Sequence, residues 1–202
     1  MAEKEHQRKD LETLLRGGFK KPLDSIAGFL LKLGLVPNHI TLLGLIGNLL
    51  AAVLIGLGYL PWAGLAAGLM APLDAVDGSM ARLRGSPKKF GAFLDSTIDR
   101  YDELLLLGGL IYYFFNQASL MGVMLTFAAS VGSVLTSYTR AKAEALGMKA
   151  SVGILTRIGR AVVLIIGLLI SQPLVSVGII AVLANFTAIQ RIYAVLQQSK
   201  AE

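Results

Sequence analysis

Long apolar stretches separated by short polar connections make up most of this chain. A helix needs about 20 residues to cross a bilayer, and six stretches come near that length: 38–57, 60–83, 91–115, 120–143, 154–170 and 173–196. Ahead of them, residues 4–32 carry Leu, Phe and Ile at helical spacing among Lys and Arg, with Pro22 as an interruption. This pattern predicts an amphipathic helix on the membrane surface, with a solvated arm as the alternative. The predicted fold class is therefore all-α, a polytopic membrane protein with six transmembrane helices.

Composition supports one membrane domain. Of the 202 residues, 54% are apolar and 16% are charged, which is unlike a soluble domain. The chain has no Cys, which excludes disulfides and thiolate metal sites. The first residues are charged and lack the apolar run of a cleavable signal peptide. We expect a juxtamembrane arm at 1–34 and a six-helix membrane domain at 35–202.

Positive charge is distributed unevenly along the chain. Lys and Arg lie in the arm, near 82–90 and 140–160, and close to the last helix, whereas the connections at 58–62, 116–119 and 171–173 have none. By the positive-inside rule, both termini and the two basic loops are expected in the cytoplasm. The net charge of +6 is therefore attributed to anionic lipid head groups and not to nucleic acid.

Four carboxylates lie at the facing ends of the second and third predicted spans. Asp74 and Asp77 are three residues apart and Asp95 and Asp99 are four apart, so each pair shares one helix face. A charged residue near membrane depth costs about 2.5 to 3.5 kcal/mol, and divalent cations would compensate that cost. Carboxylate oxygens without His or Cys favour Mg²⁺ or Mn²⁺. Two such ions could clamp a pyrophosphate for phosphoryl transfer.

The same stretch carries a family resemblance. The spacing Asp74-x2-Asp77-Gly78-x2-Ala81-Arg82-x8-Gly91-x3-Asp95-x3-Asp99 resembles, without one departure, the signature of the CDP-alcohol phosphotransferase family of integral membrane enzymes. The resemblance implies that the four aspartates bind two metal ions and that Asp99 also acts as the general base. It implies that an acceptor hydroxyl attacks the β-phosphorus of a CDP-linked lipid and expels CMP. A homodimer is implied as well.

A donor site follows in part from the resemblance. The start of the first span resembles the family's nucleotide-contacting segment. Arg82 follows Gly78 by four residues and shares its face, where it could hold the pyrophosphate; a snorkelling interfacial arginine is the alternative. Lys88 either reaches the same phosphates or belongs to an ordinary basic loop. The predicted residues that bind the CDP-linked lipid are Asn38, Thr41, Asp74, Gly78, Arg82 and Lys88.

Basic residues on the later spans suggest the acceptor. Arginine binds phosphate through a planar fork, so a cluster of arginines favours a phosphorylated acceptor, although the positive-inside bias alone would also place bases here. The predicted acceptor-phosphate residues are Arg140, Lys142, Arg157, Arg160 and Arg191. Within the family, this set and the string Asp95-Ser-Thr-Ile-Asp99-Arg100 most resemble the phosphatidylinositol-phosphate synthases of bacteria and their archaeal counterparts. That likeness implies inositol phosphate as the acceptor.

Other functions are weighed against this one. Within the family, glycerol 3-phosphate, as in the phosphatidylglycerophosphate synthases, or another alcohol could be the acceptor. Intramembrane prenyltransferases also hold diphosphate through aspartates, but their acidic motifs lie far apart in sequence, whereas Asp77 and Asp95 are 18 positions apart. A cation transporter with intramembrane carboxylates is the non-enzyme alternative. It predicts inverted repeats and broken helices, which the sequence does not show.

Overall fold

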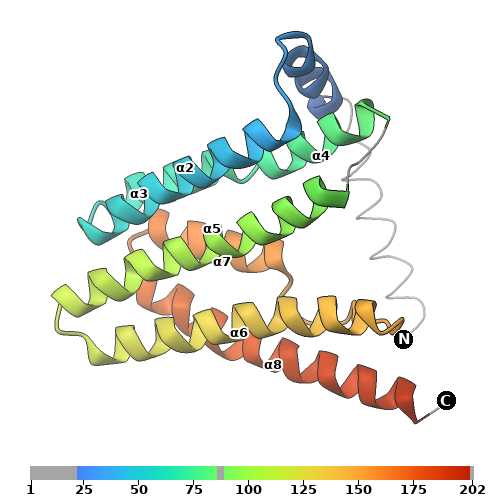
Figure 1. Ribbon diagram of the computed structural model, residues 1–202. Helices are drawn as coiled ribbons and strands as arrows, with labels where there is room; N and C mark the ends of the chain where they lie inside the picture. The colour runs from blue at the N-terminus through green and yellow to red at the C-terminus, as the bar shows by residue number, and fades with distance from the viewer. Residues whose placement is uncertain (1–21, 86–88, 201–202) are drawn as a thin grey trace. The chain divides into compact units, whose positions relative to one another are not determined.

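A computed structural model describes residues 22–85 and 89–200, and all regular structure in these ranges is helical. Residues 22–32 are helical, while the rest of the predicted surface helix and Lys88 lie outside the described ranges. The seven helices that follow (Figure 1) are α2 (Pro37–Gly56), α3 (Leu60–Met70), α4 (Leu73–Leu83), α5 (Lys89–Asn116), α6 (Leu120–Ala145), α7 (Arg157–Leu169) and α8 (Pro173–Ser199). The all-α prediction is confirmed.

The chain forms two compact units, and their boundaries cross α2 and α5. Unit 1 comprises residues 1–44 and 71–98, and unit 2 comprises residues 45–70 and 99–202. Unit 1 therefore holds the 22–32 helix, the start of α2, α4 and the start of α5. Unit 2 holds the remainder of α2 and α5 together with α3, α6, α7 and α8. The predicted division at residue 34 does not coincide with these units and stays a prediction.

Unit 1 is built around a small apolar core. Ala27 from the 22–32 helix, Ile40 from α2, and Val76 and Met80 from α4 are buried together. The opposite side of the 22–32 helix leaves Ile26 and Phe29 exposed. This helix is thus apolar on two sides, one of which packs on the protein. Its placement on a membrane surface stays a prediction.

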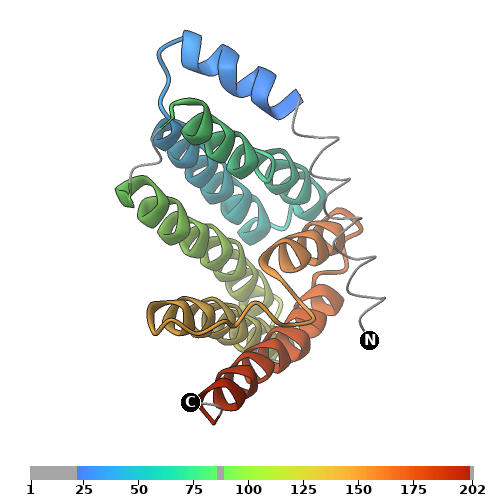
Figure 2. The ribbon, with the colours of Figure 1, turned by 90° about the vertical axis from the view of Figure 1, so that its right-hand side faces the viewer.

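Unit 2 depends on close helix packing. α6 and α8 pack against each other, and α7 packs along α3 and α8 (Figure 1, Figure 2). A Cβ on Gly64 of α3 would stand 2.9 Å from the backbone nitrogen of Leu169 in α7, so only glycine permits this approach. Between α8 and α6, the Asn185 side-chain amide donates a hydrogen bond to the Ala128 carbonyl at 2.9 Å. Small residues and interhelical hydrogen bonds are typical of helix packing in membranes.

Among the residues that the structure describes, three helices are long and apolar enough to cross a membrane: α2, α6 and α8. Large apolar side chains on their outer faces are exposed, as expected for contact with lipid; on α2 these include Leu42, Ile46, Leu49 and Val53. The chain is therefore described as a membrane protein.

The predicted second and fifth spans differ from the helices observed. The apolar run 60–83 is divided into α3 and α4 at Ala71 and Pro72, because proline lacks the N–H that would continue the helical hydrogen bonds. α7 has 13 residues, which at 1.5 Å per residue makes about 20 Å of helix. The six-span topology stays a prediction.

Candidate active site

Asp77 of α4 is the most buried of the four motif carboxylates, with 4% of its surface exposed. The Thr41 hydroxyl, from the start of α2, lies 2.7 Å from Asp77 Oδ2 and 3.2 Å from the Pro37 carbonyl oxygen. A hydroxyl has one proton to donate, and the shorter contact is the one to the carboxylate. Thr41 therefore anchors Asp77 to the first turn of α2.

The surroundings of Asp77 are suited to a cation. The negative charges of Asp95 and Asp74 act on this carboxylate, and within the described ranges no Lys or Arg forms an ion pair with it. A buried carboxylate with acidic neighbours is costly unless a positive charge compensates it. All donors are carboxylate oxygens, which fits Mg²⁺ or Mn²⁺.

The fourth motif carboxylate, Asp99, lies one turn beyond Asp95 on α5 and begins unit 2. Among the described residues, no three carboxylate or imidazole groups are gathered closely enough to hold a metal ion. The four-aspartate metal site therefore stays a prediction that the donor chemistry supports.

A cavity of about 540 Å³ lies beside Asp77 in unit 1. A Cβ on Gly78 would have Arg82 Nη1 as its nearest atom, at 3.5 Å, and a Cβ on Gly91 would have Asn38 Oδ1, at 3.7 Å. At these two glycines the cavity wall therefore consists of backbone atoms alone. The residues that line it are Val36, Pro37, Asn38, Thr41, Asp77, Gly78, Ala81, Arg82, Arg84, Phe90, Gly91, Ala92 and Asp95.

Four of the six residues predicted to bind the CDP-linked lipid line this cavity: Asn38, Thr41, Gly78 and Arg82. Asp74 lies on α4 but is not among the lining residues, and Lys88 lies outside the described ranges. The Arg82 guanidinium is held by a hydrogen bond from its Nη2 to Ser79 Oγ at 2.6 Å. A Cβ added to Gly78 would lie 3.5 Å from Arg82 Nη1, which agrees with the shared helix face expected from the spacing.

Several lining residues are not indicated by the sequence, and the two largest are Arg84 and Phe90. The sequence places Arg84 only in a basic loop and gives Phe90 no role. Arg84 follows the last residue of α4, and the backbone turns at Gly85, whose φ is +72°. The end of the helix brings Arg84 to the cavity, and the Gly85 turn signal could have indicated this end.

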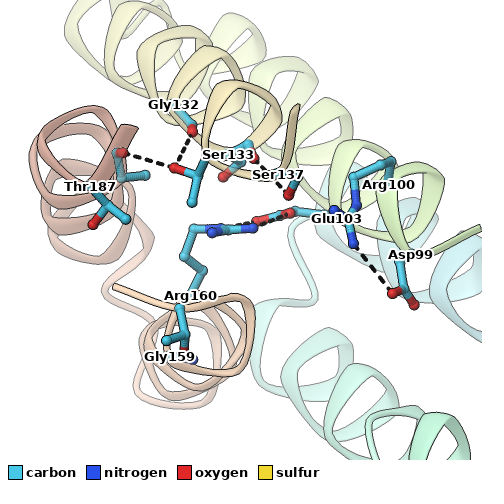
Figure 3. Close-up of polar contacts among 12 residues, drawn as sticks. Asp99, Arg100, Glu103, Gly132, Ser133, Ser137, Gly159, Arg160 and Thr187 are labelled. Carbon is cyan, nitrogen blue, oxygen red and sulfur yellow. Dashed lines mark hydrogen bonds and ion pairs between the residues drawn. The ribbon is translucent and has the colours of Figure 1, made fainter. Parts of the chain in front are cut away.

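In unit 2, Asp99 has two arginine partners. Arg157 Nη2 lies 2.5 Å from Asp99 Oδ1, and Arg100 Nη2 lies 3.3 Å from Asp99 Oδ2. Figure 3 shows Arg100 reaching Asp99 on α5. The Asp99 side chain is 9% exposed and that of Arg157 is 36% exposed. The Asp99 carboxylate is therefore held by charge-assisted contacts to two guanidinium groups.

Arg160 and Arg191 are both held by the protein itself. Arg160 is 2% exposed and makes a two-pronged contact with Glu103, at 2.5 and 2.9 Å. Glu103 lies four residues after Asp99 on α5, so the two carboxylates share a helix face. Arg191 is 5% exposed and donates to the carbonyls of Val152 and Thr136, at 2.9 and 2.5 Å.

The other two predicted acceptor residues lie on an exposed part of α6. Arg140 pairs with Glu144 one turn away at 2.8 Å, and Lys142 is exposed in the last turn. The five basic residues predicted for the acceptor thus differ in accessibility. Their role in binding a phosphate stays a prediction.

Sequence and structure comparisons identify the family. The model of the CDP-alcohol phosphatidyltransferase family matches residues 34–192. This chain belongs to the CDP-alcohol phosphatidyltransferase family. The predicted family and enzyme class are confirmed, and the prenyltransferase and cation-transporter alternatives are set aside.

Two similar proteins of this family are synthases of inositol phosphate lipids. The archaetidylinositol phosphate synthase of Pyrococcus horikoshii is 36% identical over 180 residues, which is 89% of this chain and 93% of that protein. The phosphatidylinositol phosphate synthase of Mycobacteroides abscessus is 35% identical over 191 residues, 90% of this chain and 87% of that protein.

Solved structures of a phosphatidyltransferase share this fold. The phosphatidylinositol phosphate synthase of Mycobacterium tuberculosis with CDP-DAG bound is 30% identical, with a TM-score of 0.81 over 86% of this chain and 92% of that one. The same enzyme in complex with manganese and citrate is 29% identical, with a TM-score of 0.80 over 86% of this chain and 88% of that one.

Proposed function

We propose that this enzyme transfers the phosphatidyl group of a CDP-linked lipid, CDP-diacylglycerol or its archaeal equivalent, to a hydroxyl of inositol phosphate and releases CMP. The observation that carries the proposal is the unit 1 cavity, where Asp77, Asp95 and Arg82 meet beside two side-chain-free glycines. The inositol phosphate acceptor is supported by the relatives, which are named as synthases of phosphatidylinositol phosphate and archaetidylinositol phosphate.

The cavity offers what a nucleotide diphosphate requires. Its volume of about 540 Å³ lies within the range of small-molecule sites. Arg82 presents a guanidinium that can contact two phosphate oxygens at once. The Asn38 amide both donates and accepts hydrogen bonds, which suits the polar groups of the nucleotide. Gly78 allows the phosphates to approach the α4 backbone.

Asp74, Asp77, Asp95 and Asp99 would hold the metal, which we propose is a pair of Mg²⁺ or Mn²⁺ ions. Such ions neutralise the pyrophosphate and acidify the acceptor hydroxyl. Thr41 keeps Asp77 in one orientation through its 2.7 Å hydrogen bond, which reduces the reorganisation that binding a cation would need.

Asp99 is proposed as the general base. Its carboxylate accepts the proton of the acceptor hydroxyl as that oxygen attacks the β-phosphorus of the CDP-linked lipid. A new oxygen–phosphorus bond forms while the bond to the CMP phosphate breaks, so CMP leaves with the displaced oxygen. Arg157 and Arg100 contact Asp99 and orient its carboxylate.

The acceptor's phosphate is proposed to bind the basic residues of α6, α7 and α8. Arg157 combines an exposed guanidinium with direct contact to Asp99, so a phosphate bound there would bring its hydroxyl near the base. Arg140, Lys142 and Arg191 complete the positive surroundings. Arg160 is buried against Glu103 and is proposed to support the phosphate site without direct contact. We further propose six spans, a cytoplasmic active site with both termini on that side, and a homodimer.

CMP release tests the proposal. Purified protein in detergent receives CDP-diacylglycerol and Mg²⁺, with inositol phosphate, glycerol 3-phosphate, serine or free inositol as the acceptor. The expected result is rapid CMP release with inositol phosphate and little with free inositol. Preference for glycerol 3-phosphate would contradict inositol phosphate as the acceptor but not the membership of the family. Preference for serine or free inositol would contradict the role of the arginines.

A further inference from the structure

Two ion pairs connect α5 to α7 within unit 2. Asp99 and Glu103 are four residues apart on α5, and Arg157 and Arg160 are three apart on α7, so each set shares one helix face. Arg157 contacts Asp99 at 2.5 Å, and Arg160 contacts Glu103 at 2.5 and 2.9 Å. Figure 3 shows Arg160 extending from α7 to Glu103 on α5. The two pairs are neighbours on the same two helices.

The pairs differ in how easily they can open. The Arg157 side chain is 36% exposed, so another anion can compete for it. The Arg160 side chain is 2% exposed and that of Glu103 is 16% exposed, and both prongs of the guanidinium engage the carboxylate. Breaking such a buried pair leaves an uncompensated charge, which is strongly unfavourable. The Arg160–Glu103 pair is therefore the fixed one and the Arg157–Asp99 pair the exchangeable one.

A contribution to folding stability alone does not explain why Arg160 and Glu103 are buried together. Arg160 Nη1 and Ser133 Oγ are buried, and neither has a hydrogen-bond partner within the described ranges. A buried polar network that is only partly satisfied stabilises a fold less than apolar packing would. What the pair does supply is a rigid, directional link between α5, which carries Asp99, and the first turns of α7, which carry Arg157.

We propose that Glu103 and Arg160 are positioning residues for the acceptor. They fix the start of α7 against α5. The Arg157 guanidinium can then exchange its contact with Asp99 for one with the acceptor's phosphate while the backbone of α7 stays in place. Glu103 also neutralises Arg160, so Arg157 is the one of these two α7 arginines that can exchange partners. This inference rests on the proposed function and deepens it. It assigns acceptor binding to Arg157, which exchanges Asp99 for the acceptor's phosphate while the Arg160–Glu103 pair holds α7 in place.

Glu103→Gln is the direct test, measured as steady-state CMP release from the full-length protein in detergent. The amide keeps the shape of the side chain but not the charge that holds Arg160. A misplaced Arg157 should raise the KM for inositol phosphate and lower kcat, each by about tenfold or more, while the KM for CDP-diacylglycerol stays within about twofold. Glu103→Gln combined with Arg160→Gln restores a neutral hydrogen-bonding pair and should be less impaired than Glu103→Gln alone.

Asn185→Ala is the control for a loss that is only structural. It removes the hydrogen bond from α8 to the Ala128 carbonyl of α6 and lies outside the proposed site. This variant should lower the thermal midpoint and leave both KM values unchanged. If Glu103→Gln does not fold, Arg160→Lys carries the same test, because it keeps the positive charge but lacks the two-pronged fork.

The outcomes separate this inference from the function on which it rests. If the parent protein releases no CMP with any phosphorylated acceptor, the proposed function fails before a variant is made. If the parent is active but Glu103→Gln keeps its KM for inositol phosphate, the positioning role is overturned. It is also overturned if Glu103→Gln behaves like Asn185→Ala, or if the double variant is more impaired than Glu103→Gln.

Discussion

At the scale of single residues, the Thr41 hydroxyl lies against the most buried carboxylate of the motif. Thr41 and Asp77 are 36 positions apart in sequence, and their hydrogen bond connects α2 to α4. Sequence comparison with the family suggested only that Thr41 faces the nucleotide. The structure adds that it orients a carboxylate proposed to bind metal.

Thr41→Val should weaken metal activation. Valine keeps the branched shape but removes the donor, and a hydrogen bond to a charged group is worth about 1.5 to 3 kcal/mol. We expect the Mn²⁺ concentration for half-maximal CMP release to rise about tenfold or more. Thr41→Ser retains the hydroxyl and is the matched control. Equal Mn²⁺ dependence of Thr41→Val and the parent would show that this bond does not support the site.

Gly78→Ala tests the cavity as the donor site. The added Cβ would make an ordinary contact of 3.5 Å with Arg82 Nη1, so the protein should fold with unchanged thermal stability. The methyl group would occupy space proposed for the phosphates, and the KM for CDP-diacylglycerol should rise about tenfold, since misplacement at a reacting centre is costly. Gly44→Ala is the matched control, because its Cβ would meet no atom within 4 Å. An unchanged KM in Gly78→Ala would place the donor elsewhere.

At the scale of elements, helix contacts through glycine support unit 2. Gly64→Ala would force its Cβ to 2.9 Å from the Leu169 backbone nitrogen, and such overpacking typically costs about 1 to 3 kcal/mol. The thermal midpoint should fall by several degrees, measured in detergent by fluorescence or circular dichroism. Gly108→Ala adds the same methyl where no atom lies within 4 Å, so its midpoint should not change. A drop of equal size in both variants would contradict the assigned α3–α7 contact.

The helices agree with most of the predicted spans and differ from the span predicted at 60–83. The predicted spans 38–57, 91–115, 120–143 and 173–196 correspond closely to α2, α5, α6 and α8. The apolar residues of 60–83 continue past Pro72 and so predict one span, although the proline itself indicates a break in the helix. α5 has 28 residues but carries four acidic residues in and just past its first half, so it is long enough to cross a membrane but not apolar enough to be counted with α2, α6 and α8.

At the scale of the whole molecule, local motifs were more predictable than long-range pairs. The spacing of Gly78 and Arg82, four residues apart, predicted that they share a face of one helix, because that follows from helix geometry alone. The Arg160–Glu103 pair joins residues 57 positions apart. Nothing local in the sequence distinguishes Arg160 from Arg157, so only tertiary packing shows which of the two has a buried partner.

Asp99→Asn separates binding from chemistry. Every residue that lines the cavity belongs to unit 1, whereas Asp99 belongs to unit 2. Asparagine cannot accept the acceptor's proton, so turnover should fall by about a hundredfold or more, while binding of CDP-diacylglycerol, measured directly, stays largely intact. Robust residual turnover would remove Asp99 as the base.

The account depends most on carboxylates that bind metal ions and thereby hold the phosphates of the CDP-linked lipid. The most direct measurement is a Mn²⁺ titration by electron paramagnetic resonance, with CDP-diacylglycerol present, for the parent protein and Asp77→Asn. We expect two bound ions per chain in the parent and fewer in Asp77→Asn. A parent that binds no Mn²⁺, or an Asp77→Asn variant that binds as many ions as the parent, would contradict it.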